Sequence, residues 1–191
     1  MKKQMKSDML AKRKSHACEL VEKKSAAIME RLFALPEFRK AKTILFYAAK
    51  KDEVQTLEMI QKALDMGKTV ALPITVVEGK NLVLAEVRNL SRLSEGAFGV
   101  LEPMDYVPVK PEEVDLVIVP GVAFDVHGDR LGHGMGYYDK LLKQMPDALF
   151  IGLAFEFQMV EDIPEEEHDV SVHKVVTEER VIGCGQDKTF C

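Results

Sequence analysis

The sequence predicts an α/β fold, a three-layer sandwich with a mostly parallel central sheet and helices on both faces. Two runs, VDLVIVP at residues 114–120 and ALFIGLAF at residues 148–155, are apolar throughout, as strands covered on both faces are. Strand and helix patterns also alternate between residues 43 and 73, a spacing typical of a parallel sheet with helices packed on it. At 191 residues, the chain is long enough for a core, and we expect a single domain over residues 1–191.

The first half of the chain contains two helical patterns and three strand patterns. Apolar side chains recur at helical spacing before Pro36, which predicts one long helix or two broken ones that end there. A second helical pattern is followed by Gly67, where a C-terminal cap is expected. The predicted elements are a helical region at 3–35, a strand at 43–48 (TILFYA), a helix at 54–67, and strands at 68–73 (KTVALP) and 81–87 (NLVLAEV).

The second half contains an irregular stretch followed by a return to regular elements. Gly96, Gly99 and three prolines interrupt residues 89–111, and loops of this length in a compact domain are usually functional or disordered. The elements expected after it are the strand at 114–120, a helix that begins in GYYDKLLKQM at 136–145, the strand at 148–155, and short strands in VSVHKVVT at 170–177 and RVIG at 180–183.

Composition narrows the class of protein. A formal net charge of -5 argues against general nucleic-acid binding, which requires a basic surface. No apolar run reaches the roughly 18 residues of a membrane span, and the lysine-rich start lacks the apolar stretch of a signal peptide. Cys18, Cys184 and Cys191 form no CxxC pattern, so neither a disulfide framework nor a zinc finger is indicated. We therefore expect a cytoplasmic protein without nucleic-acid or membrane partners, as a monomer or weak dimer.

The stretch RLGHGMGYYD, Arg130 to Asp139, is the strongest candidate for a ligand site. It follows a predicted buried strand, and in open α/β sheets ligands bind at the carboxyl ends of the strands. Three glycines at alternate positions would let the backbone approach a phosphate closely. The alternative is that the glycines only make tight turns, because the stretch lacks both the Walker ending and the dinucleotide spacing.

The longer run that contains this stretch is more specific. VDLVIVPGVAFDVHGDRLGHGMGYYDKLL resembles the signature of the 5-formyltetrahydrofolate cyclo-ligase family, which passes through Pro-Gly and Phe-Asp to Gly-x-Arg-Leu-Gly and Gly-x-Gly-Tyr-Tyr-Asp. The resemblance extends to ILFYAAKKDEVQT, GKTVALP, GAFGVLEP and LAFEFQMVEDIPEEEHDVSVHKVVTEERVI, and so covers nearly the whole chain. It implies an enzyme that uses ATP and Mg²⁺ to close 5-formyltetrahydrofolate to 5,10-methenyltetrahydrofolate, with release of ADP and phosphate.

The resemblance also implies a role for individual residues. Arginine suits two-pronged contact with phosphate oxygens, and Mg²⁺ bound to phosphates usually takes one or two protein carboxylates. The implied ATP-binding residues are Lys2, Lys6, Arg130, Leu131, Gly132, His133, Gly134, Met135, Gly136, Tyr137 and Tyr138; the implied substrate-binding residues are Glu53, Phe98 and Tyr138; the implied metal ligands are Asp139 and Asp169. Lys2 and Lys3 are adjacent, and the sequence leaves open which one contacts ATP.

Several positions depart from the family pattern. His133 and Met135 stand where many members carry Arg or Lys, which removes fixed charges from the phosphate cradle. The other departures are Lys6 in place of Arg, Ile74 and Thr75 in place of an Arg-Tyr pair, and His173 in place of a frequent Asp. An alternative is therefore a non-catalytic or altered-substrate relative that still binds folate or nucleotide.

A third hypothesis takes histidines as metal ligands. The candidates are His127, His133, His168 and His173. Their spacing matches no standard zinc site, so we expect surface residues instead.

Overall fold

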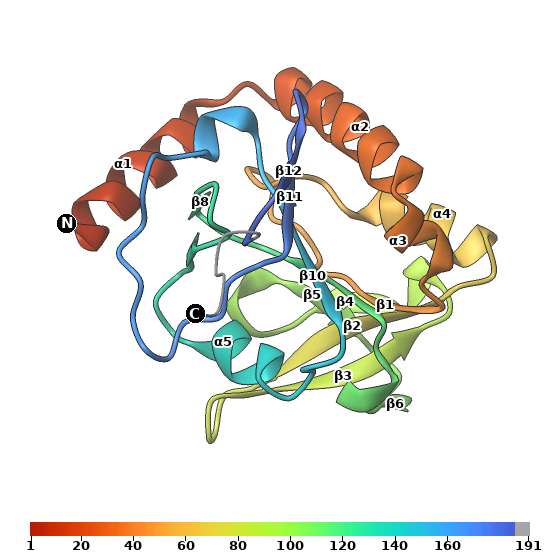
Figure 1. The fold of residues 1–191 in the computed structure, drawn as a ribbon. Coiled ribbons are helices and arrows are strands. Elements are labelled where there is room, and N and C mark those ends of the chain that lie inside the picture. Colours follow the sequence, from red (N-terminus) through yellow and green to blue (C-terminus); the bar gives the residue numbers. More distant parts are fainter. Residues whose placement is uncertain (186–191) are drawn as a thin grey trace.

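The computed structural model describes residues 1–185, whose centre is an eight-stranded sheet (Figure 1). The strand order is β12-β11-β10-β7-β1-β2-β3-β6. Among the described residues, four of its seven pairings are parallel: β1 with β2 and β7, and β10 with β7 and β11. The strands are β1 (Thr43–Leu45), β2 (Thr69–Val76), β3 (Asn81–Val87), β6 (Pro108–Val109), β7 (Leu116–Val119), β10 (Leu149–Leu153), β11 (Lys174–Val176) and β12 (Val181–Gly183). The mostly parallel sheet is confirmed.

Helices cover both faces of this sheet because the side chains of each strand alternate between two apolar clusters. In β1, Ile44 packs with α2 (Cys18–Ala34), α3 (Pro36–Lys40) and α4 (Leu57–Asp65), whereas Leu45 packs with α5 (Tyr137–Leu142) on the opposite face. Val117 and Ile118 of β7 divide in the same way. A strand buried on both faces needs an apolar residue at every position, which explains the continuous apolar runs.

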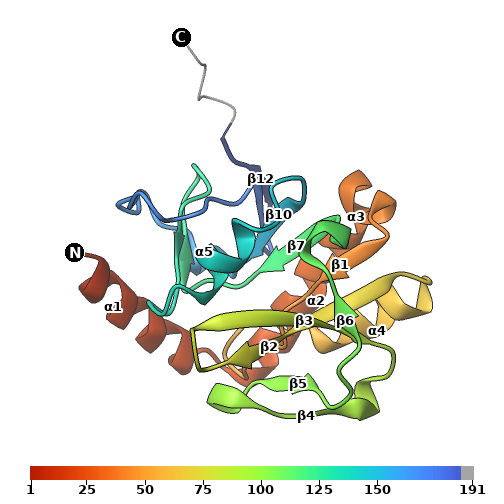
Figure 2. The same ribbon diagram turned by 90° about the horizontal axis from the view of Figure 1, so that it is seen from below.

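The N-terminal region forms two helices, the second of the two alternatives predicted. α1 (Lys2–Ser15) ends before His16, and α2 begins at Cys18. Met9 of α1 packs with Val122, Leu131 and Ile163 in a small third cluster beside the sheet. Figures 1 and 2 both show α1 at the side of the sheet, away from α2, α3 and α4.

The structure adds two features that were not predicted and corrects one prediction. α2 ends before Pro36 as expected, and a short helix, α3, begins at this proline, because a proline at the first helical position forms no helical N–H bond in any case. β3 pairs antiparallel with β2 through a turn at residues 77–80. The stretch at 89–111 is less irregular than expected, since it contains the hairpin β4 (Leu93–Glu95) and β5 (Leu101–Pro103) and the edge strand β6 (Figure 2).

Other predictions hold with shifted boundaries. Gly67 follows α4 with φ 75°, a left-handed conformation that suits the predicted cap. Within residues 1–185, no helix has both the length and the apolar character that a membrane span needs. Cys191 and residues 186–190 lie outside the described part, and the single domain stays a prediction.

Candidate active site

A cavity of about 680 Å³ opens at the carboxyl ends of the neighbouring parallel strands β1 and β7. Tyr47 and Ala48 follow β1 in its wall, and Pro120 follows β7. After β1 the next strand, β2, is added on one side of this pair, and after β7 the next parallel strand, β10, is added on the other side. The strand order therefore reverses between β1 and β7, and open α/β sheets bind ligands at such a topological switch point. Every site residue predicted from the sequence lines the cavity except Lys6.

The glycine loop, residues 132–136, forms one wall of the cavity. Gly134 and Gly136 have φ of 90° and 73°, in the left-handed region where a side chain is strained. Within the described chain, none of the five backbone N–H groups donates a hydrogen bond to protein. The loop therefore presents a row of free donors, as an anion site requires.

Arg130 lies under this loop and is held by an acidic partner. The short hairpin of β8 (Ala123–Phe124) and β9 (Arg130–Leu131) positions it. Its Nη2 donates to Asp139 Oδ1 at 2.9 Å, and only 5% of its side chain is exposed. Its Nε is buried without a partner among the described residues. Its guanidinium carbon also lies 5.9 Å from the centre of the Tyr138 ring.

Lys2 lines the cavity and pairs with two acids. Its Nζ donates to Asp169 Oδ2 and to Glu166 Oε1, both at 3.0 Å. Burial would lower the pKa of Lys2, but the hydrogen bonds to Asp169 and Glu166 raise it above its ordinary value. Burial would raise the pKa of Asp169, and Lys2 and the Glu166 N–H outweigh this and lower it. Both groups are therefore charged at neutral pH.

Asp139 and Asp169, the predicted metal ligands, are brought to the same cavity. The N–H of Val170, next to Asp169 in the chain, donates to Asp139 Oδ1 at 3.1 Å. Each side chain is about one-fifth exposed and engages one carboxylate oxygen in hydrogen bonds. The donor set fits a hard cation, which needs only one or two carboxylates when phosphate oxygens supply other ligands. Glu166 and His168 also place ligand atoms within 4.8 Å of Asp169.

Lys6 contacts the glycine loop from outside the cavity lining. Its Nζ donates to the backbone carbonyl of His133. A Cβ added at Gly134 would lie 3.2 Å from the same Nζ. α1 therefore brings both Lys2 and Lys6 to the glycine-loop side of the site, while no contact of Lys3 with the site is seen among the described residues.

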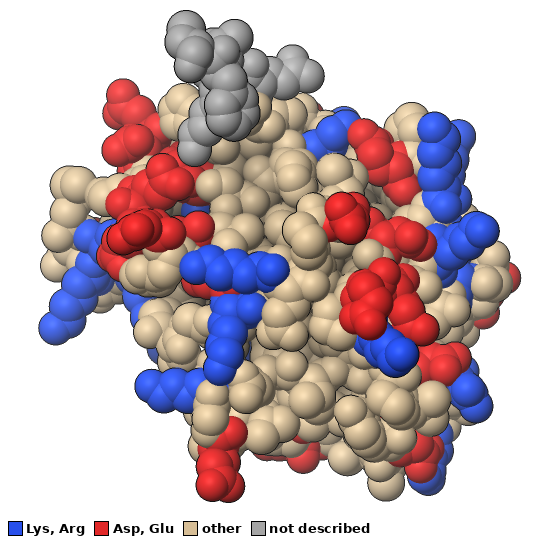
Figure 3. Space-filling view, turned by 60° about the horizontal axis from the view of Figure 1, so that its bottom comes forward, with Lys and Arg blue, Asp and Glu red and all other residues tan. Residues whose placement is uncertain are grey.

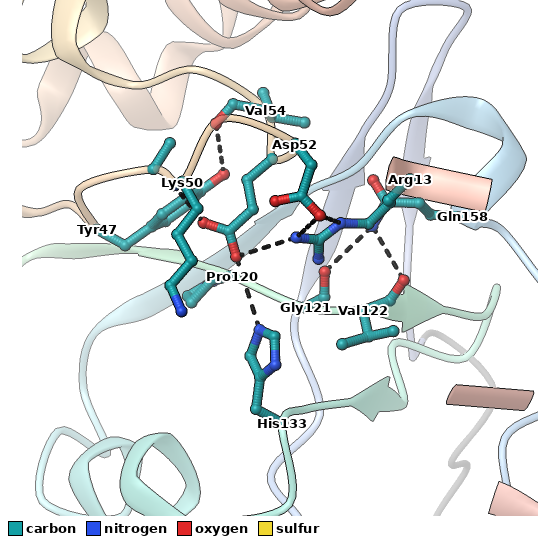
Figure 4. A network of polar contacts seen from close by, with 12 residues as sticks. Arg13, Tyr47, Lys50, Asp52, Val54, Pro120, Gly121, Val122, His133 and Gln158 are labelled. Carbon is teal, nitrogen blue, oxygen red and sulfur yellow. Dashed lines mark hydrogen bonds and ion pairs between the residues drawn. The ribbon is translucent and has the colours of Figure 1, made fainter. Parts of the chain in front are cut away.

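Glu53 lines the cavity from the segment that follows β1. Its Oε1 is 3.5 Å from Arg13 Nη2 and 3.7 Å from His133 Nε2, and its Oε2 accepts the N–H of Lys50 at 2.8 Å (Figure 4). Burial would raise the pKa of Glu53, but these partners outweigh burial and lower it. Glu53 thus presents an ionised acceptor to the cavity.

Apolar and aromatic residues complete the cavity wall. Phe98 has φ 59° and is 52% exposed, with its ring edge-on to Tyr137 at 6.3 Å. Strain in an exposed aromatic residue is more typical of a ligand site than of packing. Burial raises the pKa of Tyr138 well above its ordinary value, so its hydroxyl stays protonated. The remaining apolar lining consists of Tyr47, Pro73, Leu82 and Val100.

Comparisons with known proteins agree with this geometry. A profile of the 5-formyltetrahydrofolate cyclo-ligase family matches residues 1–178. The chain belongs to this family.

Relatives and solved structures extend the match over most of the chain. A 5-formyltetrahydrofolate cyclo-ligase of Haemophilus influenzae is 34% identical over 156 residues, 78% of this chain and 83% of the relative. A probable cyclo-ligase of Caenorhabditis elegans is 31% identical over 179 residues, 86% of each chain. The 5,10-methenyltetrahydrofolate synthetase of Aquifex aeolicus superposes with TM-score 0.87 at 37% identity, covering 100% of this chain and 96% of that one. The Mycoplasma pneumoniae synthetase, at 22% identity and TM-score 0.76 over 93% and 98%, supports the fold alone.

Positions that depart from the cyclo-ligase pattern separate into two groups. His133, Met135 and Thr75 line the cavity, so their side chains can alter what binds there. His173 does not line it. Its Nδ1 accepts the N–H of Phe150 at 2.8 Å, a bond that an aspartate carboxylate could also accept. The change at His173 is therefore structural.

Sequence reasoning missed several residues of the site. Arg13, only 1% exposed, was indistinguishable by composition from the other charges of a lysine-rich helix. Its spacing was the available signal, because Lys2, Lys6, Met9 and Arg13 follow one another at helical intervals of four, three and four residues. Lys50 and Glu166 also line the cavity and were missed, and His168, considered only as one of four histidine ligands, lines it as well.

The histidine hypothesis is wrong as a four-residue site. In the described part of the chain, His168 joins a group of possible ligands only with Glu166 and Asp169, and no such group contains His127, His133 or His173.

Proposed function

We propose that the chain closes 5-formyltetrahydrofolate to 5,10-methenyltetrahydrofolate with consumption of ATP, the activity that its family and its relatives are named for. One observation carries the proposal. A single cavity of about 680 Å³ is lined by a row of free N–H groups, by cations, by the ionised Glu53 carboxylate and by aromatic residues. Its volume is within the range of small-molecule sites.

Two sets of residues at the cavity match the two substrates. The phosphates of ATP would be held by three cations, Lys2, Lys6 and Arg130, and by the backbone from Leu131 to Tyr138. This backbone includes the first helical turn at Tyr137 and offers free N–H groups at Gly132, His133, Gly134, Met135 and Gly136. Glu53 would accept hydrogen bonds from the donor-rich edge of the reduced pterin. Phe98 and Tyr138 would flank a folate ring.

The chemistry consists of two transfers. The formyl oxygen forms a bond to the γ-phosphorus as the bond from that phosphorus to ADP breaks. N10 of the folate then attacks the formyl carbon, the C–O bond to phosphate breaks, and the N10 proton is lost to water or to the departing phosphate. Positioning and charge neutralisation are the main requirements, as in other phosphoryl transfers.

Asp139 and Asp169 would hold Mg²⁺, which neutralises charge on phosphate oxygens when bound. Their free carboxylate oxygens, partial exposure and shared cavity support the assignment. Arg130 orients the Asp139 carboxylate through their 2.9 Å bond.

Small-molecule substrates alone account for the site, so we also propose a cytoplasmic enzyme that acts as a single domain, monomeric or weakly dimeric, without a nucleic-acid partner. The face drawn in Figure 3 carries basic and acidic side chains in small separate groups instead of one continuous basic surface, in keeping with this proposal.

The test is the appearance of 5,10-methenyltetrahydrofolate absorbance from 5-formyltetrahydrofolate with Mg-ATP. The unaltered protein should turn over, and Asp139→Ala should lose turnover by at least about a hundredfold, the scale of removing an electrostatic stabiliser in the transition state. Arg92→Gln, which removes an exposed ion pair with Asp105 outside the cavity, serves as control. No turnover by unaltered protein that still binds ATP would refute the proposal and favour a non-catalytic relative.

A further inference from the structure

We propose that Arg13 is a positioning residue: it holds the Glu53 carboxylate, from behind the cavity wall, in the place and charge state that bind the reduced pterin. The inference rests on the proposed function, and it adds a residue that neither the cyclo-ligase motif nor the cavity lining identifies. It follows from four features of this region, and Figure 4 shows the contacts of Arg13 and His133.

The first feature is the place of Arg13 relative to the cavity. Glu53 lines the cavity, whereas Arg13 does not and is 1% exposed. The Arg13 guanidinium therefore cannot touch a ligand directly. It can act on one only through Glu53, whose Oε1 lies 3.5 Å from its Nη2.

The second feature is that the loop carrying Glu53 does not need Arg13 to keep its shape. Tyr47 donates its hydroxyl to Val54 O at 3.0 Å, and Gln55 Nε2 donates to Lys50 O and Glu53 O, both at 2.8 Å. The N–H of Gln55 also donates to Ser25 Oγ at 2.9 Å. These bonds hold the backbone on both sides of Glu53, so the contribution of Arg13 is to the acidic side chains.

The third feature is that the contacts of Arg13 are poor ones for stability. Its Nε and Nη2 share a single acceptor, Asp52 Oδ2, at 3.1 and 2.9 Å. Its Nη1 is buried without a partner among the described residues. A buried cation with an unsatisfied N–H is weak evidence for a stabilising role, and replacement of such groups by apolar ones is often neutral. A role in the site explains this burial better.

The fourth feature is the set of groups that face Glu53. Arg13 comes from α1, His133 from the glycine loop, and the Lys50 N–H from the same segment as Glu53. The hydroxyls of Tyr47 and Tyr138 are also close: burial raises their pKa most, and the Glu53 charge raises it further. Of these groups, Arg13 alone carries a permanent charge. Burial would raise the pKa of Glu53, but the hydrogen bonds from His133 and the Lys50 N–H lower it, and the Arg13 charge lowers it further without itself depending on pH.

Two substitutions separate this role from a structural one because they change Glu53 in opposite directions. Arg13→Gln removes the cation, so Glu53 should accept a proton at higher pH. Asp52→Asn replaces the competing carboxylate by a neutral amide oxygen, a weaker acceptor, and removes a neighbouring negative charge, so Arg13 should act more strongly on Glu53 and Glu53 should accept a proton at lower pH. Asp52 is 27% exposed and the change keeps its shape, so we expect this variant to fold even where Arg13→Gln does not.

The measurement is the Kd of 5-formyltetrahydrofolate by calorimetry without ATP, from about pH 4 to about pH 8, on both sides of the ordinary glutamate pKa. For Arg13→Gln we expect about tenfold weaker binding at neutral pH. The acid loss of binding should move up by about one pH unit, the effect of removing an opposite charge at this range. For Asp52→Asn that acid loss should move down, and in a Glu53→Gln background Arg13→Gln should change Kd less than about twofold.

The outcomes distinguish the two proposals. Arg92→Gln, which removes an equivalent Arg–Asp pair on the surface, should match the unaltered protein throughout and corrects for titration of the folate itself. If Asp52→Asn leaves the acid loss of binding in place or moves it up, or if Arg13→Gln lowers only the melting temperature, the positioning role is refuted. If the unaltered protein binds no 5-formyltetrahydrofolate, the proposed function itself fails.

Discussion

Alanine at Gly132 and at Gly136 should have opposite effects, because the same loop constrains the two positions differently. Gly136 has φ 73°, and an added Cβ would meet nothing within 4 Å. The only penalty is the left-handed backbone, which costs an L-residue about 1–2 kcal/mol. Part is offset because alanine restricts the unfolded chain, by about 0.4–1 kcal/mol. A net loss of about 1 kcal/mol should lower Tm by roughly 2–4 °C for a chain of this size.

At Gly132 the backbone is outside the left-handed region, but an added Cβ would lie 3.0 Å from Arg130 Nη1. The guanidinium must move by a few tenths of an ångström, while it is held by Asp139 at 2.9 Å. We expect stability to change by less than about 0.5 kcal/mol. Turnover should fall roughly threefold to tenfold, since a misplacement of about 1 Å at a reacting group can cost about a hundredfold.

Thermal unfolding and the methenyl absorbance assay, run on both variants, check the pair. Gly136→Ala should lose stability and keep more turnover, and Gly132→Ala should keep stability and lose more turnover. Equal losses of Tm would contradict the backbone argument. Full turnover in Gly132→Ala would refute the role of Arg130.

Three further outcomes are expected. Glu53→Gln should raise the KM for 5-formyltetrahydrofolate about tenfold and leave the KM for ATP within about twofold in steady-state kinetics, because a neutral amide is a weaker acceptor; an equal rise in both would contradict the assignment. Lys2→Ala should cost less than about 1 kcal/mol in denaturant unfolding. This loss of stability should be present at pH values between the ordinary pKa of Asp169 (3.8) and that of Lys2 (10.5). It should vanish as the pH falls through the lowered pKa of Asp169, and also as the pH rises through the raised pKa of Lys2. A loss of stability that does not depend on pH would refute the pairing. EDTA should abolish turnover while ATP still binds in calorimetry; turnover in EDTA would refute the metal assignment.

The fold could be predicted where a buried element has a recognisable pattern of apolar residues in the sequence. β7 and β10 are buried on both faces, so their apolar runs were unambiguous. The hairpin of β4 and β5 could not be predicted, because its strands are short and partly exposed. The direction of β3 was also hidden, since an alternating strand pattern is compatible with either direction and the turn that sets it spans only residues 77–80.

The site was predictable only as far as its motif extends. Glycines at alternate positions indicate a loop, and the family signature added Asp139 and Asp169, residues that no local pattern connects. Helical spacing placed Arg13 on the same helix face as Lys2 and Lys6, but its role could not be predicted, because that role comes from Asp52 and Glu53, about forty positions away in the chain. The sequence does not show which charges on a helix are buried, and burial is what distinguishes Arg13 from its neighbours Lys12 and Lys14.

The charges of the site are arranged so that its main cations already have acidic partners. Arg130 pairs with Asp139, Lys2 with Asp169, and Arg13 with Glu53. An anion that binds alone must compete with a carboxylate for Arg130 or Lys2. The displaced carboxylate would then lie next to the negative charge of the anion. An anion that arrives with a divalent cation exchanges both partners at once, so that no charge is left unpaired. Arg13 does not line the cavity and is outside this exchange, and Glu53, the carboxylate that we propose binds the folate, should therefore keep its charge while the phosphate-binding groups are rearranged.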